Sequence, residues 1–164
     1  MTVLGETGMR VRELCDLAWD DIKISPRRSF LVVKYAQPGR TRRVPLSSAA
    51  KRALYSIDYS SLKSSTAKVF IGQRGALTPR GVQLMLKKYG RDINMNTLSP
   101  HQLRHTFCKN LIDQGVSLAK VAMLAGHESL ESTRRYCEEK SETPVEPNPD
   151  MVATFIEEDT EELV

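Results

Sequence analysis

One β-hairpin signal stands among a series of helix signals, and this order constrains the fold more than any other feature of the chain. Residues 30–35 are rich in β-branched and aromatic side chains, residues 38–39 are a Pro-Gly turn pair, and residues 41–46 follow as a returning strand. Elsewhere Thr78 and Ser99 each stand directly before a proline, which is typical of helix N-termini. The sequence therefore predicts a mainly α-helical domain with a small antiparallel β-sheet near its N-terminal third.

Apolar spacing and capping residues predict the remaining elements. Residues 2–17 are expected to form the end of one helix, a Thr-Gly turn and the start of a second helix, and residues 68–71 a third strand. The other expected helices begin at a serine or threonine, and two of them end at a glycine. They run from Ser47 or Ser48 to about Tyr59, onward from Thr78, from Ser99 to Gly115, from Ser117 to Gly126, and through a last short helix that carries Tyr136.

The charge of the chain is divided unevenly along its length. Residues 138–164 hold ten of the 20 acidic side chains and one of the 24 basic ones, so residues 1–137 carry 23 basic and ten acidic side chains, a formal charge of +13. A region this basic favours a polyphosphate partner, because each phosphate that is neutralised releases condensed counterions. We expect one domain over residues 1–140 and an acidic, proline-containing linker with a C-terminal helix over residues 141–164. That helix packs either on its own domain or on a neighbouring copy, through Met151, Val152, Phe155 and Ile156.

Length and composition favour a single domain outside membranes. A chain of 164 residues with 40% hydrophobic residues can bury one core. No apolar run approaches the roughly 20 residues of a membrane span, and the N-terminus lacks a basic-then-apolar signal pattern. We expect a cytoplasmic protein with no membrane partner, whose cysteines (Cys15, Cys108 and Cys137) are free thiols.

All three histidines fall in one part of the chain. His101 and His105 flank Arg104, and His127 precedes Tyr136 by nine residues. A guanidinium, imidazoles and a phenol, without a pair of carboxylates, suit an anionic centre attacked by tyrosine better than a metal ion or an acyl group. The spacing of His101 and His105 also fits zinc. A glutamine, however, follows His101 where the H-E-x-x-H motif of zinc peptidases has glutamate, and this argues against a metal site.

Several ordered segments resemble the tyrosine recombinase (phage integrase) family. The family signature has an H-x-L-R-H segment, a G-H pair and a T-x-x-Y segment, preceded by a T-G-hydrophobic-R-hydrophobic-x-E-L segment and a basic strand that closes on V-P-L. In this chain the segments stand at residues 101–105, 126–127, 133–136, 7–14 and 42–46. They cover nearly all of the expected domain, and such an ordered set is far more specific than a single H-x-x-R. The resemblance implies the catalytic-domain fold of the family, which agrees with the predicted elements.

The resemblance also implies which residues do chemistry. By their places in the motifs, Arg10, His101, Arg104 and His127 are expected to bind and activate a DNA phosphate that Tyr136 attacks. Two planar guanidinium groups suit this transition state, since its charge lies on the non-bridging phosphate oxygens. A phenol, with an ordinary pKa of about 10, needs cationic neighbours or a base. The phosphodiester energy is kept in a 3′-phosphotyrosyl bond, so no metal, ATP or other cofactor is expected.

One departure from the family concerns the general acid for the leaving 5′-oxygen. The family places a lysine seven residues before the valine of V-P-L, and in this chain that position is Gln37, which cannot act as an acid. Lys34 is our choice for the acid; a contribution from Arg40, a shifted register or an impaired enzyme are the alternatives. The residues expected to contact DNA are Gln37, Arg40, Arg42, Arg43, Arg80 and His105. His105 either supports the phosphate pocket from behind or supports the fold.

The expected activity is site-specific cleavage and rejoining of double-stranded DNA by residues 1–140. The resemblance implies a homotetramer on two DNA sites, with the C-terminal helix a candidate for exchange between copies. It also implies an N-terminal DNA-binding domain that this chain lacks, so we expect a nucleoid-associated fragment that binds DNA weakly. Two alternatives are a catalytically impaired DNA-binding accessory relative and an enzyme like a type IB topoisomerase.

Overall fold

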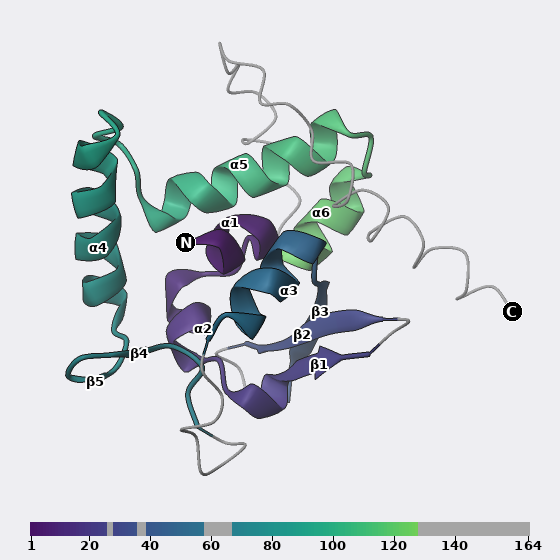
Figure 1. Cartoon of the computed structure of the whole chain (residues 1–164). Coiled ribbons are helices and arrows are strands. Elements are labelled where there is room, and N and C mark those ends of the chain that lie inside the picture. Colours follow the sequence, from purple (N-terminus) through teal and green to yellow (C-terminus); the bar gives the residue numbers. More distant parts are fainter. Residues whose placement is uncertain (26–27, 36–38, 58–66, 128–164) are drawn as a thin grey trace, which may run out of the picture.

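The computed structural model describes residues 1–25, 28–35, 39–57 and 67–127 (Figure 1). The chain begins with α1 (Thr2–Thr7), turns at Gly8 and continues as α2 (Val11–Asp16), which confirms the helix, turn and helix predicted there. Gly8 ends α1 with a φ of 59°, in the left-handed region that favours glycine. A short 3₁₀ helix, η1 (Trp19–Asp21), then leads into the sheet.

The larger sheet has three antiparallel strands in the order β1 (Ile22–Ile24), β2 (Ser29–Lys34) and β3 (Thr41–Pro45). The β2–β3 pair is the predicted hairpin, with Val33 opposite Arg42. Burial alternates along both strands, so one face of the sheet packs on the core and the other faces outward.

The prediction of a strand over residues 68–71 is confirmed only at Ile71, and that strand does not join the larger sheet. The only strand pairing of Lys68 is an isolated bridge to Ala18, and β4 (Ile71–Gly72) pairs with β5 (Gly75–Ala76) in a separate small sheet. The third strand of the main sheet is instead β1, which pairs with β2 and spans three residues. A strand this short carries little hydrophobic alternation, so its pairing with β2 determines it more than its own sequence does.

Four helices begin where hydroxyl residues predict them. The N-cap side chains of Ser47, Thr78, Ser99 and Ser117 each accept a hydrogen bond from the backbone N–H three residues later. The helices are α3 (Ser48–Tyr55), α4 (Pro79–Asp92), α5 (Pro100–Asp113) and α6 (Leu118–Ala125). Three predicted features lie outside the described residues. They are the end of α3 at about Tyr59, the helix carrying Tyr136 and the C-terminal helix.

The core forms around α1, which packs against both α3 and α5, while α6 contacts β3 and α2 contacts α4. In Figure 1 the sheet lies on one side of this centre and α4 on the other. Leu4, Met9 and Phe107 are among the fully buried side chains. The arrangement brings the start of α2, the start of α5 and the end of α6 together, and it confirms the predicted fold class of a mainly α-helical domain with a small antiparallel sheet.

Two further predictions concern cysteines and membranes. Cys15 and Cys108 are buried and form no disulfide, and Cys137 lies outside the described residues. None of the helices in the described ranges is long and apolar enough to cross a bilayer.

Candidate active site

Arg10 lies at the start of α2, where two neighbours direct its side chain. Its backbone N–H donates to Glu13 Oε2 at 2.6 Å, and its Nη1 lies 3.3 Å from Glu13 Oε1. Its Nη2 donates to the carbonyl oxygen of Gly126 at 2.8 Å, which joins the start of α2 to the end of α6. The side chain is still 45% exposed, so a ligand can reach the guanidinium.

Arg104 supplies a second guanidinium from the second turn of α5. The residue is only 5% exposed, and its Nη1 donates to the carbonyl oxygen of Gly8 at 2.6 Å. Burial lowers the pKa of Arg104 from its ordinary value, and the nearby charges of Arg10 and Arg42 add to this. An arginine with a lowered pKa keeps its charge at neutral pH, so two fixed positive charges meet here.

His101 and His127 reach the same region from two different helices. His101 is exposed in the first turn of α5, and His127 directly follows Gly126, which ends α6 with a φ of 72°. Burial, followed by the charges of Arg104 and Arg10, lowers the pKa of His127 to about 4. Its imidazole is therefore neutral at pH 7. A phosphate anion bound beside it favours the protonated form and so raises this pKa.

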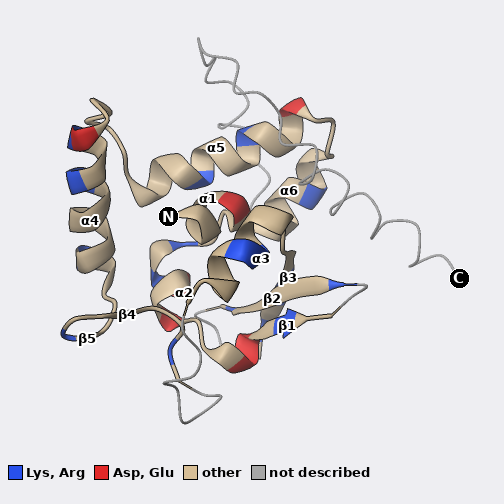
Figure 2. Cartoon of the chain, viewed as in Figure 1, with Lys and Arg blue, Asp and Glu red and all other residues tan. Residues whose placement is uncertain are grey.

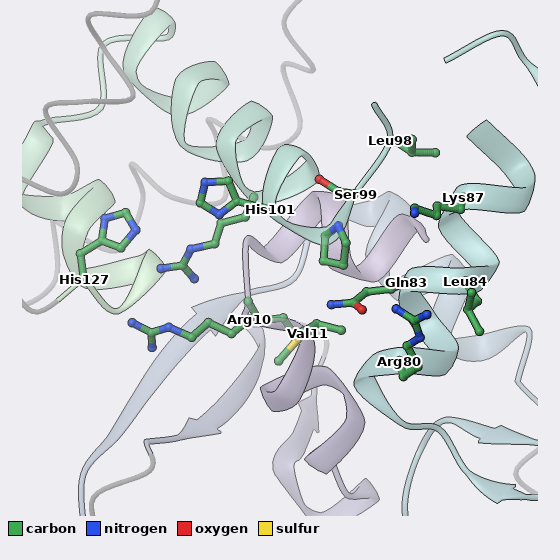
Figure 3. A pocket seen from close by; sticks show the side chains of 13 residues that line it. Arg10, Val11, Arg80, Gln83, Leu84, Lys87, Leu98, Ser99, His101 and His127 are labelled. Atoms are coloured by element: carbon green, nitrogen blue, oxygen red, sulfur yellow. The ribbon is translucent and has the colours of Figure 1, made fainter. Parts of the chain in front are cut away.

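These four side chains line one cavity of about 660 Å³. Figure 3 shows Arg10, His101 and His127 at one end of the cavity and side chains of α4 at the other. The α4 residues are one turn apart on a single helix face, as expected for spacings of three and four. The lining residues are Met9, Arg10, Val11, Arg80, Gln83, Leu84, Lys87, Leu98, Ser99, Pro100, His101, Arg104 and His127. The cavity can hold an anion between Arg10 and Arg104, and a larger ligand can extend from there along α4.

Lys34 lines a neighbouring cavity of about 520 Å³, which shares Arg10 with the first. Its Nζ pairs with Asp21 Oδ1 at 2.6 Å, and the side chain of Lys34 is 67% exposed whereas that of Asp21 is 8% exposed. The structure thus does not bring Lys34 into the cavity that holds both arginines. Its role as the general acid stays a prediction, and the position of Gln37 lies outside the described residues.

The other predicted DNA contacts are distributed over the hairpin and α4. Arg40 and Arg43 are exposed, with their guanidinium carbons 5.6 Å and 5.1 Å from the ring centres of Tyr35 and Phe30. Basic residues also occur on α3, α4 and α5 (Figure 2), and they include Arg80, which is exposed and lines the cavity. His105 is half-buried in α5, and Tyr136 lies outside the described residues.

The predicted DNA contact of Arg42 is corrected by the structure. Arg42 is 6% exposed, and its Nη1 and Nη2 donate to the two carboxylate oxygens of Glu13 at 2.9 Å and 2.7 Å. It points to the inner face of the sheet, as does Val44 two residues on, so it cannot reach a duplex on the surface. Its position in a run of basic residues suggested a surface role that the inward side of the strand excludes.

Glu13 has a place in the site that its motif alone did not reveal. Its carboxylate accepts from the backbone and side chain of Arg10 and from both ends of the Arg42 guanidinium. Burial raises its pKa, but the hydrogen bonds and charges of Arg42 and Arg10 outweigh this and hold the pKa below its ordinary value. The signal for it was its position three residues after Arg10, where a glutamate returns to the N-cap backbone of a helix.

No group of three His, Cys, Asp or Glu side chains that could hold a metal ion occurs within residues 1–25, 28–35, 39–57 and 67–127. The cavity instead offers guanidinium groups, imidazoles and an ammonium, which are donors to an anion.

Comparisons with known sequences agree with this arrangement. The sequence pattern of the Phage integrase family matches residues 1–143. Tyrosine recombinase XerA of Pyrococcus horikoshii is 32% identical over 142 residues, which are 83% of this chain and 48% of that protein. Tyrosine recombinase XerC of Bacillus pumilus is 36% identical over 146 residues, 83% of this chain and 47% of that protein. The chain therefore belongs to the phage integrase family, and it spans about half the length of these curated relatives.

Solved structures share the fold. The crystal structure of XerA recombinase superposes with a TM-score of 0.75 at 23% identity, over 99% of this chain and 56% of that chain. XerH site-specific recombinase bound to its difH substrate gives a TM-score of 0.67 at 24% identity, over 83% of this chain and 42% of that chain. The fold is thus the tyrosine recombinase catalytic-domain fold, as the sequence predicts.

Proposed function

We propose that residues 1–140 are the DNA breaking and rejoining domain of a site-specific recombinase that works through Tyr136. The observation that carries this proposal is the cavity in which Arg10 and Arg104 stand with His101 and His127. Membership in the phage integrase family supports it, as do relatives that are named tyrosine recombinases.

In the proposed reaction the phenolate oxygen of Tyr136 attacks the phosphorus of one DNA strand. The bond from Oη to phosphorus forms as the bond from phosphorus to the 5′-oxygen breaks, which leaves a 3′-phosphotyrosyl link and a 5′-hydroxyl. The phenol proton passes to an imidazole of the cavity, and the leaving oxygen takes a proton from the general acid. A 5′-hydroxyl of a second strand reverses the step, so phosphodiester bonds are conserved and ATP is not consumed.

Arg10 and Arg104 are proposed to hold the two non-bridging oxygens in the transition state. Charge-assisted bonds to phosphate are strong, and losing one such donor typically costs about 10²–10³ in rate. Because both guanidinium groups are already anchored, on Gly126 and Gly8, little reorganisation is needed when the phosphate binds. No metal or other cofactor is needed for this charge stabilisation.

Lys34 is proposed as the general acid, because Gln37 occupies the position where the family has a lysine. The test replaces the scissile 5′-oxygen of the DNA by sulfur, because a thiolate leaves without being protonated. If Lys34 is the acid, Lys34→Ala is slow on the oxygen substrate and close to wild type on the sulfur substrate. An equal loss on both substrates removes Lys34 from this role, and a gain in Gln37→Lys on the oxygen substrate then indicates an impaired enzyme.

The proposed partner is double-stranded DNA, bound across the exposed hairpin and α4. Arg40, Arg43 and Arg80 contact phosphates there, with Gln37 and His105 as further candidates. Phosphate contacts position a duplex and carry little sequence information. The cavity face of α4 adds Gln83, whose amide can donate to and accept from a base edge. In the cell this places the protein on the nucleoid in the cytoplasm.

We further propose that copies assemble as a homotetramer on two DNA sites and exchange their C-terminal helices. The apolar residues at helical spacing after the proline-containing linker support this. Deletion of residues 144–164 is expected to leave cleavage by single protomers intact and to reduce assembly on two-site DNA, measured by sedimentation. Assembly that is unchanged by the deletion contradicts the exchange and favours packing within one copy.

Plasmid relaxation separates the proposed function from its alternatives. A site-specific recombinase acts on supercoiled plasmid only when its site is present, whereas an enzyme like a type IB topoisomerase relaxes any plasmid. An accessory relative binds DNA but relaxes and recombines none. Relaxation that does not depend on sequence, or binding without any strand breakage, therefore rejects the recombinase proposal.

A further inference from the structure

Arg42 lies beneath the candidate active site without lining it. Its side chain is 3% exposed and does not border the 660 Å³ cavity, although Arg10, Arg104 and His127 all do. It extends inward from β3, and its guanidinium carbon lies 5.2 Å from the ring centre of Tyr35. A buried arginine at this place needs partners, and its hydrogen bonds lead to the two helices that flank the site.

The first partner is Glu13 on α2. Two parallel hydrogen bonds of 2.9 Å and 2.7 Å join the guanidinium fork to both carboxylate oxygens, which is the geometry of a strong bidentate pair. The same carboxylate accepts the backbone N–H of Arg10 at 2.6 Å and lies 3.3 Å from its Nη1. Arg42 therefore fixes the group that orients Arg10.

The second partner is the end of α6. Nε of Arg42 donates to the carbonyl oxygen of Leu124 at 2.8 Å. This carbonyl is in the last turn of the helix, where backbone acceptors have no partner within the helix. Three N–H groups of one side chain thus tie α2, β3 and α6 together.

Gly126 makes the connection to His127. A Cβ at Gly126 would lie 2.7 Å from Nη1 and 2.8 Å from Cζ of Arg42, so only glycine leaves room for the guanidinium there. The carbonyl of the same residue accepts Nη2 of Arg10 at 2.8 Å, and His127 is the next residue. Arg42 therefore packs against Gly126, the residue whose carbonyl holds Arg10 and which directly precedes His127.

We propose that Arg42 is a positioning residue of the recombinase site, which holds the Arg10 guanidinium and the His127 imidazole at a fixed separation from inside the domain. This rests on the proposed function. It assigns to Arg42 an effect on the rate of DNA cleavage and none on DNA affinity, because its side chain does not reach the surface.

The informative variant is Arg42→Lys. Lysine keeps the positive charge beside Glu13, but its single ammonium cannot form the parallel fork and the bond to Leu124 together. Arg42→Ala is less useful, because it leaves a buried carboxylate without its main partner. The matched control is Arg74→Lys, the same chemical change at an exposed residue between β4 and β5.

Covalent adduct formation and DNA binding are measured on nicked duplexes drawn from the DNA that flanks the coding sequence of the chain. In Arg42→Lys we expect the cleavage rate to fall by about 10²-fold, the cost of a small misplacement at a reacting centre. The affinity for duplex should stay at the value of Arg74→Lys. Loss of affinity to the same degree as cleavage, or a cleavage rate equal to the control, overturns the proposal.

A second readout does not depend on DNA cleavage. The chain has three histidines, so labelled imidazoles give three signals in an NMR titration, and His127→Gln assigns the relevant one. In wild type His127 should titrate with a pKa of about 4. In Arg42→Lys this pKa should rise toward its ordinary value. A His127 pKa that stays at the wild-type value contradicts positioning.

The two readouts separate failure of this inference from failure of the proposed function. If wild type forms no adduct, the recombinase proposal fails, while the titration still tests whether Arg42 positions His127. If Arg42→Lys does not fold, Gly126→Ala replaces it, because the added methyl group would contact the Arg42 guanidinium directly. This variant should likewise reduce the cleavage rate and leave the DNA affinity unchanged. Wild-type cleavage by folded Gly126→Ala refutes the inference.

Discussion

Gly8 is predicted to tolerate no side chain, and the cost can be worked out from its surroundings. Its φ of 59° lies in the left-handed region, where an L-residue other than glycine costs about 1–2 kcal/mol. A Cβ there would also overlap Cδ1 of Phe107 and lie 2.6 Å from Cε1 of the same ring, which is fully buried and cannot move aside cheaply. Overpacking of this kind costs about 1–3 kcal/mol. Gly8→Ala should therefore lose about 3 kcal/mol of unfolding free energy.

The control for this prediction is Gly115→Ala. Gly115 has a φ of 85°, but a Cβ there would meet no atom of the described residues within 4 Å, so the variant should lose only the backbone cost of about 1–2 kcal/mol. Urea unfolding followed by circular dichroism gives both losses. Equal losses in the two variants would refute the packing argument. Because the Gly8 carbonyl holds Arg104, the larger loss should also be accompanied by slower cleavage.

Three further predictions concern ionisable side chains of the site and of the β2–β3 hairpin. His127 should titrate by NMR with a pKa of about 4, which lies below the ordinary 6.5, so its contribution to folding stability is full above pH 6.5 and is lost as the pH falls through 4. This loss of stability should be absent in His127→Gln. If the loss persists in that variant, other groups cause it. Arg40→Ser and Arg43→Ser should each weaken DNA binding and reduce the slope of log affinity against log salt by about 1, and an unchanged slope would remove that residue from the phosphate contacts. Arg104→Lys and Arg10→Ala should each lower the rate of adduct formation by about 10²–10³, and a wild-type rate in either would contradict its role as an oxyanion donor.

Local signals in the sequence predicted most helix starts correctly, because a cap depends on residues within one turn. Thr78, Ser99 and Ser117 all cap helices as expected. The strand β1 was missed for the opposite reason. It spans three residues, and its pairing with β2 is set by tertiary contacts that a short window of sequence does not contain.

The candidate site shows the same limit. The motifs predicted a cluster of Arg10, His101, Arg104 and His127, and all four line one cavity. The buried place of Arg42 depends on Glu13, 29 residues earlier, and on Leu124, 82 residues later, and no local pattern links these positions. The period of two along β3 did contain a signal, since Arg42 shares the face of the buried Val44.

The central claim is that Tyr136 forms a covalent bond to DNA with help from the Arg10 and Arg104 cavity and without a metal ion. The most direct test incubates the chain in EDTA with nicked duplexes that trap the first cleavage step, and maps the adduct by mass spectrometry. The account predicts an adduct on Tyr136 in wild type, none in Tyr136→Phe, and far less in Arg104→Lys. An adduct that survives in Tyr136→Phe, or DNA binding by wild type with no adduct at all, would contradict it.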